Sequence, residues 1–155
     1  MNAIRDQEGG LTQETLVIDN DSADETTEIV SEKFPEVRLV ETGANLCFAA
    51  ANNLALEEAS GDFIVLIYPD SVIGPGAIAA AVDYLRENEA CGLCGGLLVD
   101  EEGETHPSAR KFPSPLIKFL TISGLSEKFS ASKFFGAGDF RWFDHQNPLA
   151  VDWVP

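Results

Sequence analysis

Two aspartates in this 155-residue chain stand at or just beyond apolar runs, where a carboxylate can bind a ligand. Asp19 ends the run in segment 15–20, and Asp70 closely follows the unbroken apolar run 63–67. In open parallel sheets, ligands bind outside the carboxyl ends of the strands, so both carboxylates are expected to face one crevice. One carboxylate there can accept a hydrogen bond from a base N–H or a ribose hydroxyl. The other can bind a hard divalent cation that bridges a diphosphate.

Both aspartates also have plainer interpretations. Proline and aspartate are common turn residues, so Pro69-Asp70 also fits a simple turn. The acids between positions 21 and 25 fit helix capping, because carboxylates stabilise a helix N-terminus. Ser22 and Glu25 have the spacing of a capping box. Asp19 precedes that cap by three residues, and capping explains it less well.

Segment 74–79 matches a G-x-G-x-x-A dinucleotide fingerprint, and Asp100 ends the next predicted strand about where a ribose-binding acid would stand. In that fingerprint the strand runs straight into the first glycine, whereas residues 68–73 separate the apolar run from this one. Pro75 suits the first turn of a helix, so the glycines also fit a plain helix start. A nicotinamide-dependent oxidoreductase is therefore kept as a less favoured alternative.

The pair Cys91 and Cys94 forms a C-x-x-C motif. A redox pair would stand at the junction of a strand and a helix, but this pair lies in or at the start of a predicted strand, 91–99. A zinc site needs two more ligands. The other possible zinc ligands, Cys47, His106 and His145, lack paired spacing. We therefore expect Cys91 and Cys94 to be buried structural cysteines, because a free cysteine usually behaves as a small hydrophobic residue. We expect the two histidines to lie on the surface or in loops.

Strands and helices alternate along the chain. The apolar patterns predict strands at 15–20, 37–40, 63–67 and 91–99, and helices at 22–34, 48–60, 75–89 and 115–125. Such alternation is typical of βαβ units. We therefore predict an α/β fold with an open, mainly parallel sheet and helices on both faces, in one domain over 1–155. The run 63–67 would be a strand buried on both faces.

Composition narrows the function classes. A hydrophobic content of 45% argues against general disorder. The net charge of −16, from 26 acidic and 10 basic residues, argues against a nucleic-acid partner. A phosphorylated ligand would need a divalent cation or a helix N-terminus. No apolar run approaches a membrane span, and the start does not have the pattern of a signal peptide. Three cysteines fit a reducing cytoplasm.

Several blocks, in order and with matching spacing, resemble inverting family 2 glycosyltransferases. Asn45–Asn53 is similar to the family's Asn-x-Gly-Phe-Ala-x-x-Asn-Asn block, and Phe63–Ser71 to the strand ending in Asn-Pro-Asp-Thr, its version of the metal-binding Asp-x-Asp. The remaining blocks, of which the last two resemble the rhamnosyltransferase-like branch, are Val17–Thr26, Phe34–Glu41, Pro107–Pro113 and Val151–Val154.

The resemblance implies a nucleotide-diphospho-sugar transferase fold of the glycosyltransferase A type. It implies inverting transfer of a sugar from a dTDP- or UDP-sugar donor to a glycan acceptor in cell-wall or polysaccharide biosynthesis. Asp70 would ligate Mg or Mn, which stabilises the leaving diphosphate. Nucleotide-binding roles fall on Asp19, Asn45, Cys47, Asn53 and Arg110.

Two positions depart from the family pattern. Tyr68 stands where the family often has Asn or Asp. Metal binding would therefore depend almost entirely on Asp70. Cys47 replaces a glycine that lets the backbone approach the ligand, and its side chain could crowd the base.

We expect a chain truncated at both ends. Residues 1–14 resemble the end of the family's first helix, which implies that the first strand is missing, and the block that supplies the general base would lie beyond Pro155. Exposed strand edges would then favour a homodimer. Peripheral membrane association of the full-length enzyme is a second partner hypothesis. The alternative function is a non-catalytic nucleotide-binding or assembly module.

Overall fold

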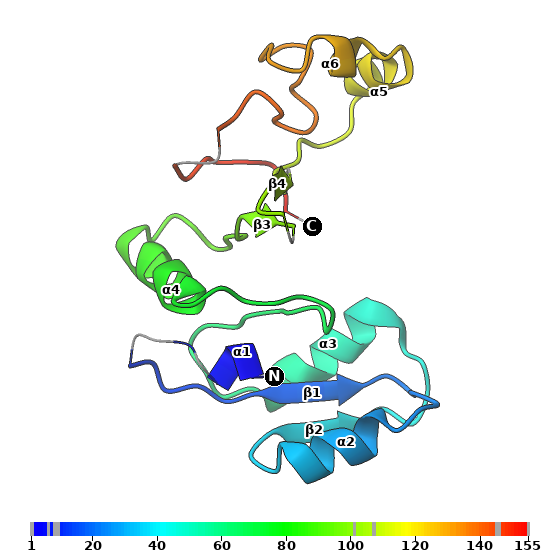
Figure 1. Cartoon of the computed structure of the whole chain (residues 1–155), viewed down its shortest axis with the longest axis vertical. Helices are drawn as coiled ribbons and strands as arrows, with labels where there is room; N and C mark the ends of the chain where they lie inside the picture. The colour runs from blue at the N-terminus through cyan, green and yellow to red at the C-terminus, as the bar shows by residue number, and fades with distance from the viewer. Residues whose placement is uncertain are drawn as a thin grey trace. The chain divides into compact units, whose positions relative to one another are not determined.

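The computed structural model describes residues 2–5, 7, 10–100, 102–106, 108–144 and 147–154. They form two compact units, Met1–Tyr84 and Leu85–Pro155, and the boundary falls within helix α4 (Ala77–Glu87) (Figure 1). The prediction of one domain over 1–155 stays a prediction.

The first unit is built on a parallel strand pair. Its elements are α1 (Asn2–Arg5), β1 (Leu16–Asp19), α2 (Thr26–Lys33), β2 (Arg38–Glu41) and α3 (Cys47–Glu58). Strands β1 and β2 pair in parallel from Leu16 opposite Arg38 to Asp19 opposite Glu41, and α2 is the crossover between them (Figure 1). Parallel strands need such a crossover, so this βαβ unit confirms the prediction for this part of the chain.

The helices of this unit begin and end for local reasons. Helix α2 ends at Lys33 because Pro35 cannot continue it. Helix α3 is rich in alanine, which has the highest helix propensity, and it contacts β1 through a face that buries Ala51. Val30 is the buried residue of α2.

The predicted capping box at Ser22 and Glu25 is wrong. Helix α2 begins at Thr26, and Glu25 at the N-cap position makes no side-chain capping bond. The Ser22 amide donates to the Asp19 carboxylate at 3.3 Å instead. The backbone at Asp21 has a φ of 71°, a left-handed turn that delays the helix start. Asp24 accepts from the Thr26 amide at 3.1 Å in place of the predicted cap.

The predicted buried strand 63–67 is also not observed. Its five side chains are 36–56% exposed, and its backbone forms no ladder with any described strand. Strand identity depends on a hydrogen-bonded neighbour, and β1 pairs only with β2 among the described residues. The open, mainly parallel sheet is therefore observed as one parallel pair and a separate antiparallel pair.

In the second unit, the predicted strand 91–99 is reduced to β3 (Leu98–Val99), which pairs antiparallel with β4 (Thr105–His106). Glycines at 92, 95 and 96 weaken the rest of the predicted strand, since glycine has no side chain to pack. Helices α5 (Pro115–Ile122) and α6 (Leu125–Lys128) follow. Ser114 caps α5 by accepting from the Ile117 amide at 3.2 Å, with Pro115 in the first turn.

Candidate nucleotide-binding site

Asp19 is a buried carboxylate at the carboxyl end of β1, with 7% of its surface exposed. Its Oδ2 accepts the Ser22 amide, whereas its buried Oδ1 has no hydrogen-bond partner among the described residues. Leaving a buried polar atom unpaired costs about 1–3 kcal/mol, more for a charged group. This oxygen is therefore suited to a ligand that brings its own donor.

The loop between β2 and α3 is tied to the end of β1. The Thr42 amide and hydroxyl donate to the Asp19 carbonyl at 3.0 and 3.1 Å. The Asn20 side chain accepts from the Leu46 amide at 2.8 Å and donates to the Asn45 side chain at 3.2 Å. Asn45 also accepts from the Cys47 amide at 3.0 Å. The structure thus brings the predicted residues Asp19, Asn45 and Cys47 onto one connected loop system.

Asn20 was not among the predicted site residues. Its position directly after Asp19 at the strand end was the available sequence signal. The direction of its side chain toward Leu46 could not be obtained from spacing alone.

Cys47 opens α3 with a left-handed backbone, φ 63°, and is exposed. Glycine adopts this conformation without steric cost, whereas a residue with a Cβ is strained there. The resemblance placed a glycine at this position, and the backbone explains why. Cys47 therefore keeps the left-handed backbone conformation that a glycine would adopt here, and it does so with local strain.

Asp70 lies in a turn, as its plainer interpretation predicted. The Ser71 amide donates to the Tyr68 carbonyl at 3.0 Å, and the Asp70 side chain is exposed. The Tyr68 ring stacks on Phe48 of α3, with centroids 5.3 Å apart and planes 9° apart. This stack places the turn that carries Asp70 beside the first turn of α3, where Cys47 also lies.

The structure does not test the roles predicted for Asn53 and Arg110. Asn53 is exposed on α3, two residues beyond the buried Ala51 and therefore about 200° around the helix from it. Arg110 lies in the second unit, and its side chain donates to the Ala109 carbonyl at 3.1 Å. Their nucleotide-binding roles stay predictions.

Asp70 fits a metal only as part of a shared ligand set. No group of three or more His, Cys, Asp or Glu suited to a metal ion occurs among the described residues. None of the described residues donates to the Asp70 carboxylate. Mg²⁺ is commonly held by one or two carboxylates together with substrate phosphates and water, so a single free carboxylate is compatible with that arrangement.

The cysteine and glycine motifs are not organised as redox or cofactor sites. Cys91 and Cys94 are half-buried instead of buried, because their glycine-rich segment forms no strand. Partial burial, with Cys91 nearby, raises the pKa of the Cys94 thiol, which disfavours a thiolate. Segment 74–79 follows no strand, and Gly76 adopts φ 71° just before α4, as expected for a helix start.

His106 is exposed on β4, where it pairs with Asp100 at 3.0 Å. The Glu104 amide is the first cause, and His106 the second, of a lowered pKa of Asp100. These contacts stabilise the turn between β3 and β4, and His106 therefore has a structural role there. His145 lies outside the described residues.

The two C-terminal blocks of the resemblance meet in the second unit. Arg110 and Trp153 form an antiparallel bridge, with N–O distances of 3.1 and 3.2 Å. The Phe112 amide donates to the Asp152 carboxylate at 2.7 Å. Pro107, which begins the first of these blocks, lies outside the described residues. The pairing gives both blocks a structural role.

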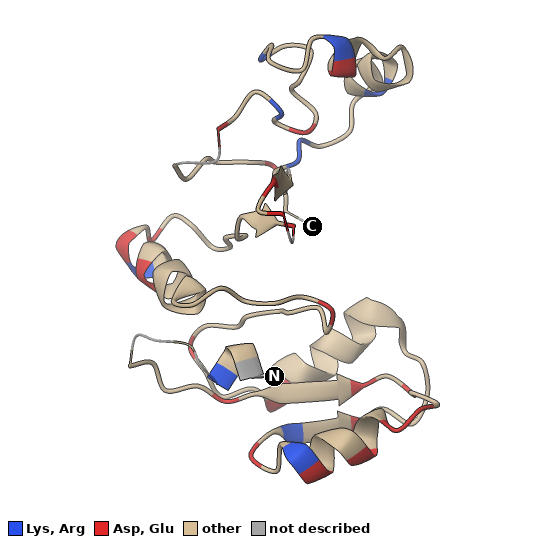
Figure 2. Ribbon diagram, viewed as in Figure 1, with Lys and Arg blue, Asp and Glu red and all other residues tan. Residues whose placement is uncertain are grey.

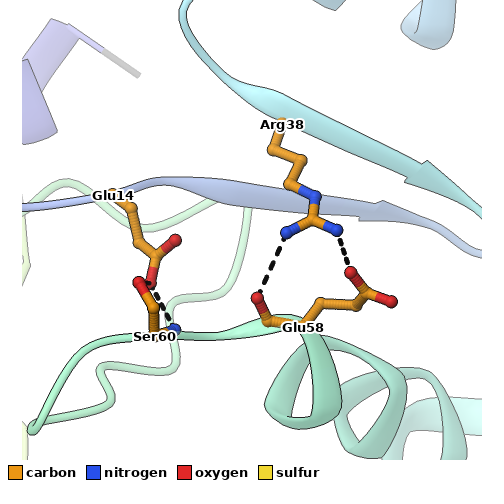
Figure 3. Close-up of polar contacts among 4 residues, drawn as sticks. All are labelled: Glu14, Arg38, Glu58 and Ser60. Atoms are coloured by element: carbon orange, nitrogen blue, oxygen red, sulfur yellow. Dashed lines mark hydrogen bonds and ion pairs between the residues drawn. The ribbon is translucent and has the colours of Figure 1, made fainter.

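The other end of β1 is anchored by side chains (Figure 3). Glu14 accepts from the Ser60 hydroxyl at 2.7 Å and from the Ser60 and Gly61 amides at 2.6 and 3.1 Å. The Ser60 hydroxyl is the largest cause of the lowered pKa of Glu14. Arg38 donates to the Glu58 carbonyl at 3.2 Å and pairs with its carboxylate. These contacts hold the end of α3 against the amino ends of β1 and β2.

A hollow of about 180 Å³ lies at this amino end of the sheet and does not coincide with the site at Asp19. It is lined by Ile4, Arg5, Gln13, Glu14, Thr15, Glu36 and Val37. Asp19 ends the same strand that Thr15 precedes, so the two features lie at opposite ends of β1.

A βαβ unit is a building block of α/β proteins, which bind their ligands at the carboxyl ends of the strands, where Asp19 and Asn20 lie here. The chain belongs to glycosyl transferase family 2, whose family profile, "Glycosyl transferase family 2", matches residues 1–146. This confirms the family inferred from the sequence blocks and implies the nucleotide-diphospho-sugar transferase type of α/β fold.

The chain is also similar to curated glycosyltransferases over part of its length. It is 36% identical over 110 residues to the N-acetylglucosaminyl-diphospho-decaprenol L-rhamnosyltransferase of Mycobacterium tuberculosis, covering 64% of this chain and 36% of that protein. It is 32% identical over 78 residues to an uncharacterized glycosyltransferase of Haemophilus influenzae, covering 48% of this chain and 31% of that protein. The chain therefore spans about a third of the length of these relatives. No solved structure matches it.

The helices of the described residues include none with the length and apolar character needed to cross a membrane.

Proposed function

We propose that the protein is a glycosyltransferase that transfers a sugar, with inversion, from a dTDP- or UDP-sugar to a glycan or polysaccharide precursor. Membership of family 2 and the rhamnosyltransferase relatives support this activity. The relative's name makes a rhamnosyl donor and a lipid-linked diphospho-sugar acceptor the first pair to test. We assign donor binding to this chain and assign no general base among its described residues. A cytoplasmic location fits a soluble nucleotide-sugar donor.

The buried, unpaired Oδ1 of Asp19 carries the proposal. A base N–H or a ribose hydroxyl would supply the missing hydrogen bond, and bonds to a charged acceptor contribute more than neutral ones. Asn45 and Cys47 lie on the loop tied to the end of β1, so they would flank the same ligand.

Asp70 would hold Mg or Mn against the donor diphosphate. It comes from the turn stacked on α3, its carboxylate is free, and substrate phosphates would complete the ligand set. The metal would stabilise the negative charge of the leaving nucleoside diphosphate.

Calorimetric titration of UDP and dTDP, with and without Mn²⁺, tests the proposal on the wild type and Asp70→Ala. Asp62→Ala is the matched control, because Asp62 is an exposed acid of the same unit outside the proposed site. We expect metal-dependent binding that Asp70→Ala loses and Asp62→Ala keeps. Absence of nucleotide binding by folded wild-type protein would contradict the donor site. Binding without turnover on an acceptor would favour the alternative of a non-catalytic nucleotide-binding module.

The proposed homodimer draws support from the exposed apolar run 63–67, whose backbone has no ladder among the described residues. Unpaired strand-like segments pair readily with another chain. Light scattering of Leu66→Lys against the wild type tests this: we expect a dimer that the substitution dissociates, and a wild-type monomer at high concentration would refute it.

A further inference from the structure

Phe48 and Tyr68 form an exposed aromatic stack at the rim of the candidate site. Their ring centroids are 5.3 Å apart and their planes differ by only 9°. Phe48 lies in the first turn of α3, and Tyr68 begins the turn that carries Asp70. The two rings cover one face of each other, while the two residues stay 55% and 56% exposed.

Packing in the core does not account for this pair. An aromatic side chain that stabilises a core buries about 150–250 Å². Phe48 and Tyr68 each leave more than half of their surface in water, which is the informative case for a large apolar group. Two parallel rings with an open outer side form a flat surface on which a further planar group can stack.

The pair joins the two parts of the proposed donor site. Phe48 directly follows Cys47, whose amide donates to Asn45 at 3.0 Å on the loop tied to the end of β1. Tyr68 stands two residues before Asp70, which would hold the metal and the diphosphate. The nucleoside of a donor must lie between these two parts, whereas the transferred sugar is attached at the other end of the diphosphate. The position of the rings therefore favours the nucleobase as their ligand.

The charges of the first unit leave few other sources of affinity for a nucleotide. The unit has three basic residues, Arg5, Lys33 and Arg38. They lie on α1, at the end of α2 and at the start of β2, and thus none lies at the carboxyl ends of β1 and β2 (Figure 2). Arg5 and Arg38 are already paired with Glu36 and Glu58. Binding at this end of the strands therefore depends on uncharged contacts and on a metal.

We propose that the Phe48–Tyr68 pair is a platform on which the nucleobase of the donor stacks, so that both residues determine the affinity for nucleotides. This inference rests on the proposed function. Stacking on aromatic side chains accepts any base, because every base has a π-face. The platform therefore selects a nucleotide over a diphosphate without a base, and the choice between bases falls to hydrogen-bonding groups such as Asp19.

Calorimetric titration with Mn²⁺ tests the platform by comparing UDP with inorganic pyrophosphate, which has no base. Phe48→Leu and Tyr68→Leu keep an apolar side chain but remove a planar ring. Each should weaken UDP binding at least about fivefold and leave pyrophosphate binding unchanged. Tyr68→Phe keeps the ring and should bind UDP like the wild type. Phe112→Leu, which removes a 63% exposed ring of the second unit, is the matched control.

Nuclear magnetic resonance gives a readout that a merely structural role of the rings would not produce. Tyr68 and Tyr84 are the two tyrosines of the chain, so tyrosine labelling gives two sets of ring signals, and Tyr84→Phe assigns them. We expect nuclear Overhauser contacts between the uracil protons of bound UDP and the Tyr68 ring. Thermal unfolding checks that every variant is folded.

The outcomes separate this inference from the proposed function. Unchanged UDP affinity of both leucine variants, with binding by the wild type intact, would overturn the platform and leave the donor site standing. Equal losses of UDP and pyrophosphate binding would also overturn it, because the rings would then act only by positioning the Asp70 turn. Absence of UDP binding by folded wild-type protein would overturn both proposals.

Discussion

The Asn20 side chain accepts a 2.8 Å hydrogen bond from the backbone amide of Leu46, joining the end of β1 to the start of α3. The same side chain donates to Asn45 at 3.2 Å. Asn20 therefore positions the loop that precedes Cys47 next to the buried carboxylate of Asp19. Asn20 and Leu46 are 26 residues apart in sequence, so this hydrogen bond ties together two loops that are distant along the chain.

Asn20→Ala should lower the free energy of unfolding by about 1 kcal/mol, since it removes a hydrogen bond to a backbone amide. Chemical denaturation of both proteins measures this difference. Asn20→Asp keeps the acceptor for the Leu46 amide and should lose less. Equal stability of Asn20→Ala and wild type would show that the tie does not hold the loop.

Cys47→Gly should stabilise the protein by about 1 kcal/mol, because φ 63° strains a residue that carries a Cβ. Thermal unfolding provides the comparison. Cys47→Ala removes the thiol but keeps the Cβ, so it should match the wild type within experimental error. A gain shared by both substitutions would assign the effect to the thiol instead of the backbone.

Gly95→Ala should destabilise the second unit by about 1–3 kcal/mol through overpacking. A Cβ at this position would lie 2.9 Å from the Val154 side chain, whereas one at Gly92 would meet nothing within 4 Å. Denaturant midpoints of Gly95→Ala and the control Gly92→Ala should therefore differ. Val154→Ala in the Gly95→Ala background should recover part of the loss, and failure to do so would exclude this clash as the cause.

Glu14→Gln should remove a pH-dependent part of the stability. Hydrogen bonds from Ser60 hold the pKa of Glu14 below its ordinary value of 4.5, so its contribution is fully present above that pH. The contribution is lost as pH falls through the lowered pKa of the folded state. Unfolding curves between about pH 3 and 7 should show a difference between wild type and variant that shrinks below about pH 4.5. A constant difference over the whole range would contradict the ionised contact.

The local pattern predicted much of the first unit. Apolar runs placed β1 and β2, Pro35 marked the end of α2, and the alanine-rich segment marked α3 within a few residues. These features depend on residues close in sequence. The run 63–67 was wrongly predicted as a buried strand because strand pairing and burial need a neighbour that the run itself does not specify.

The site was only partly predictable. The position of Asp19 at a strand end follows from the run that precedes it, but its buried, unpaired oxygen depends on how the loops fold over it. The blocks around Arg110 and Trp153 were recognised separately, and their pairing appears only in the fold. Side-chain direction, as for Asn20, is not encoded by spacing.

In the proposed site, Asp19 accepts a hydrogen bond from the donor nucleotide. The most direct measurement is calorimetric titration of UDP and dTDP into wild type, Asp19→Asn and the exposed neighbour control Asp21→Asn, with Mn²⁺ present. Asp19→Asn should weaken binding at least tenfold, because a charged acceptor contributes about 1.5–3 kcal/mol, while Asp21→Asn should bind like the wild type. Equal affinity of wild type and a folded Asp19→Asn would show that Asp19 does not bind the nucleotide.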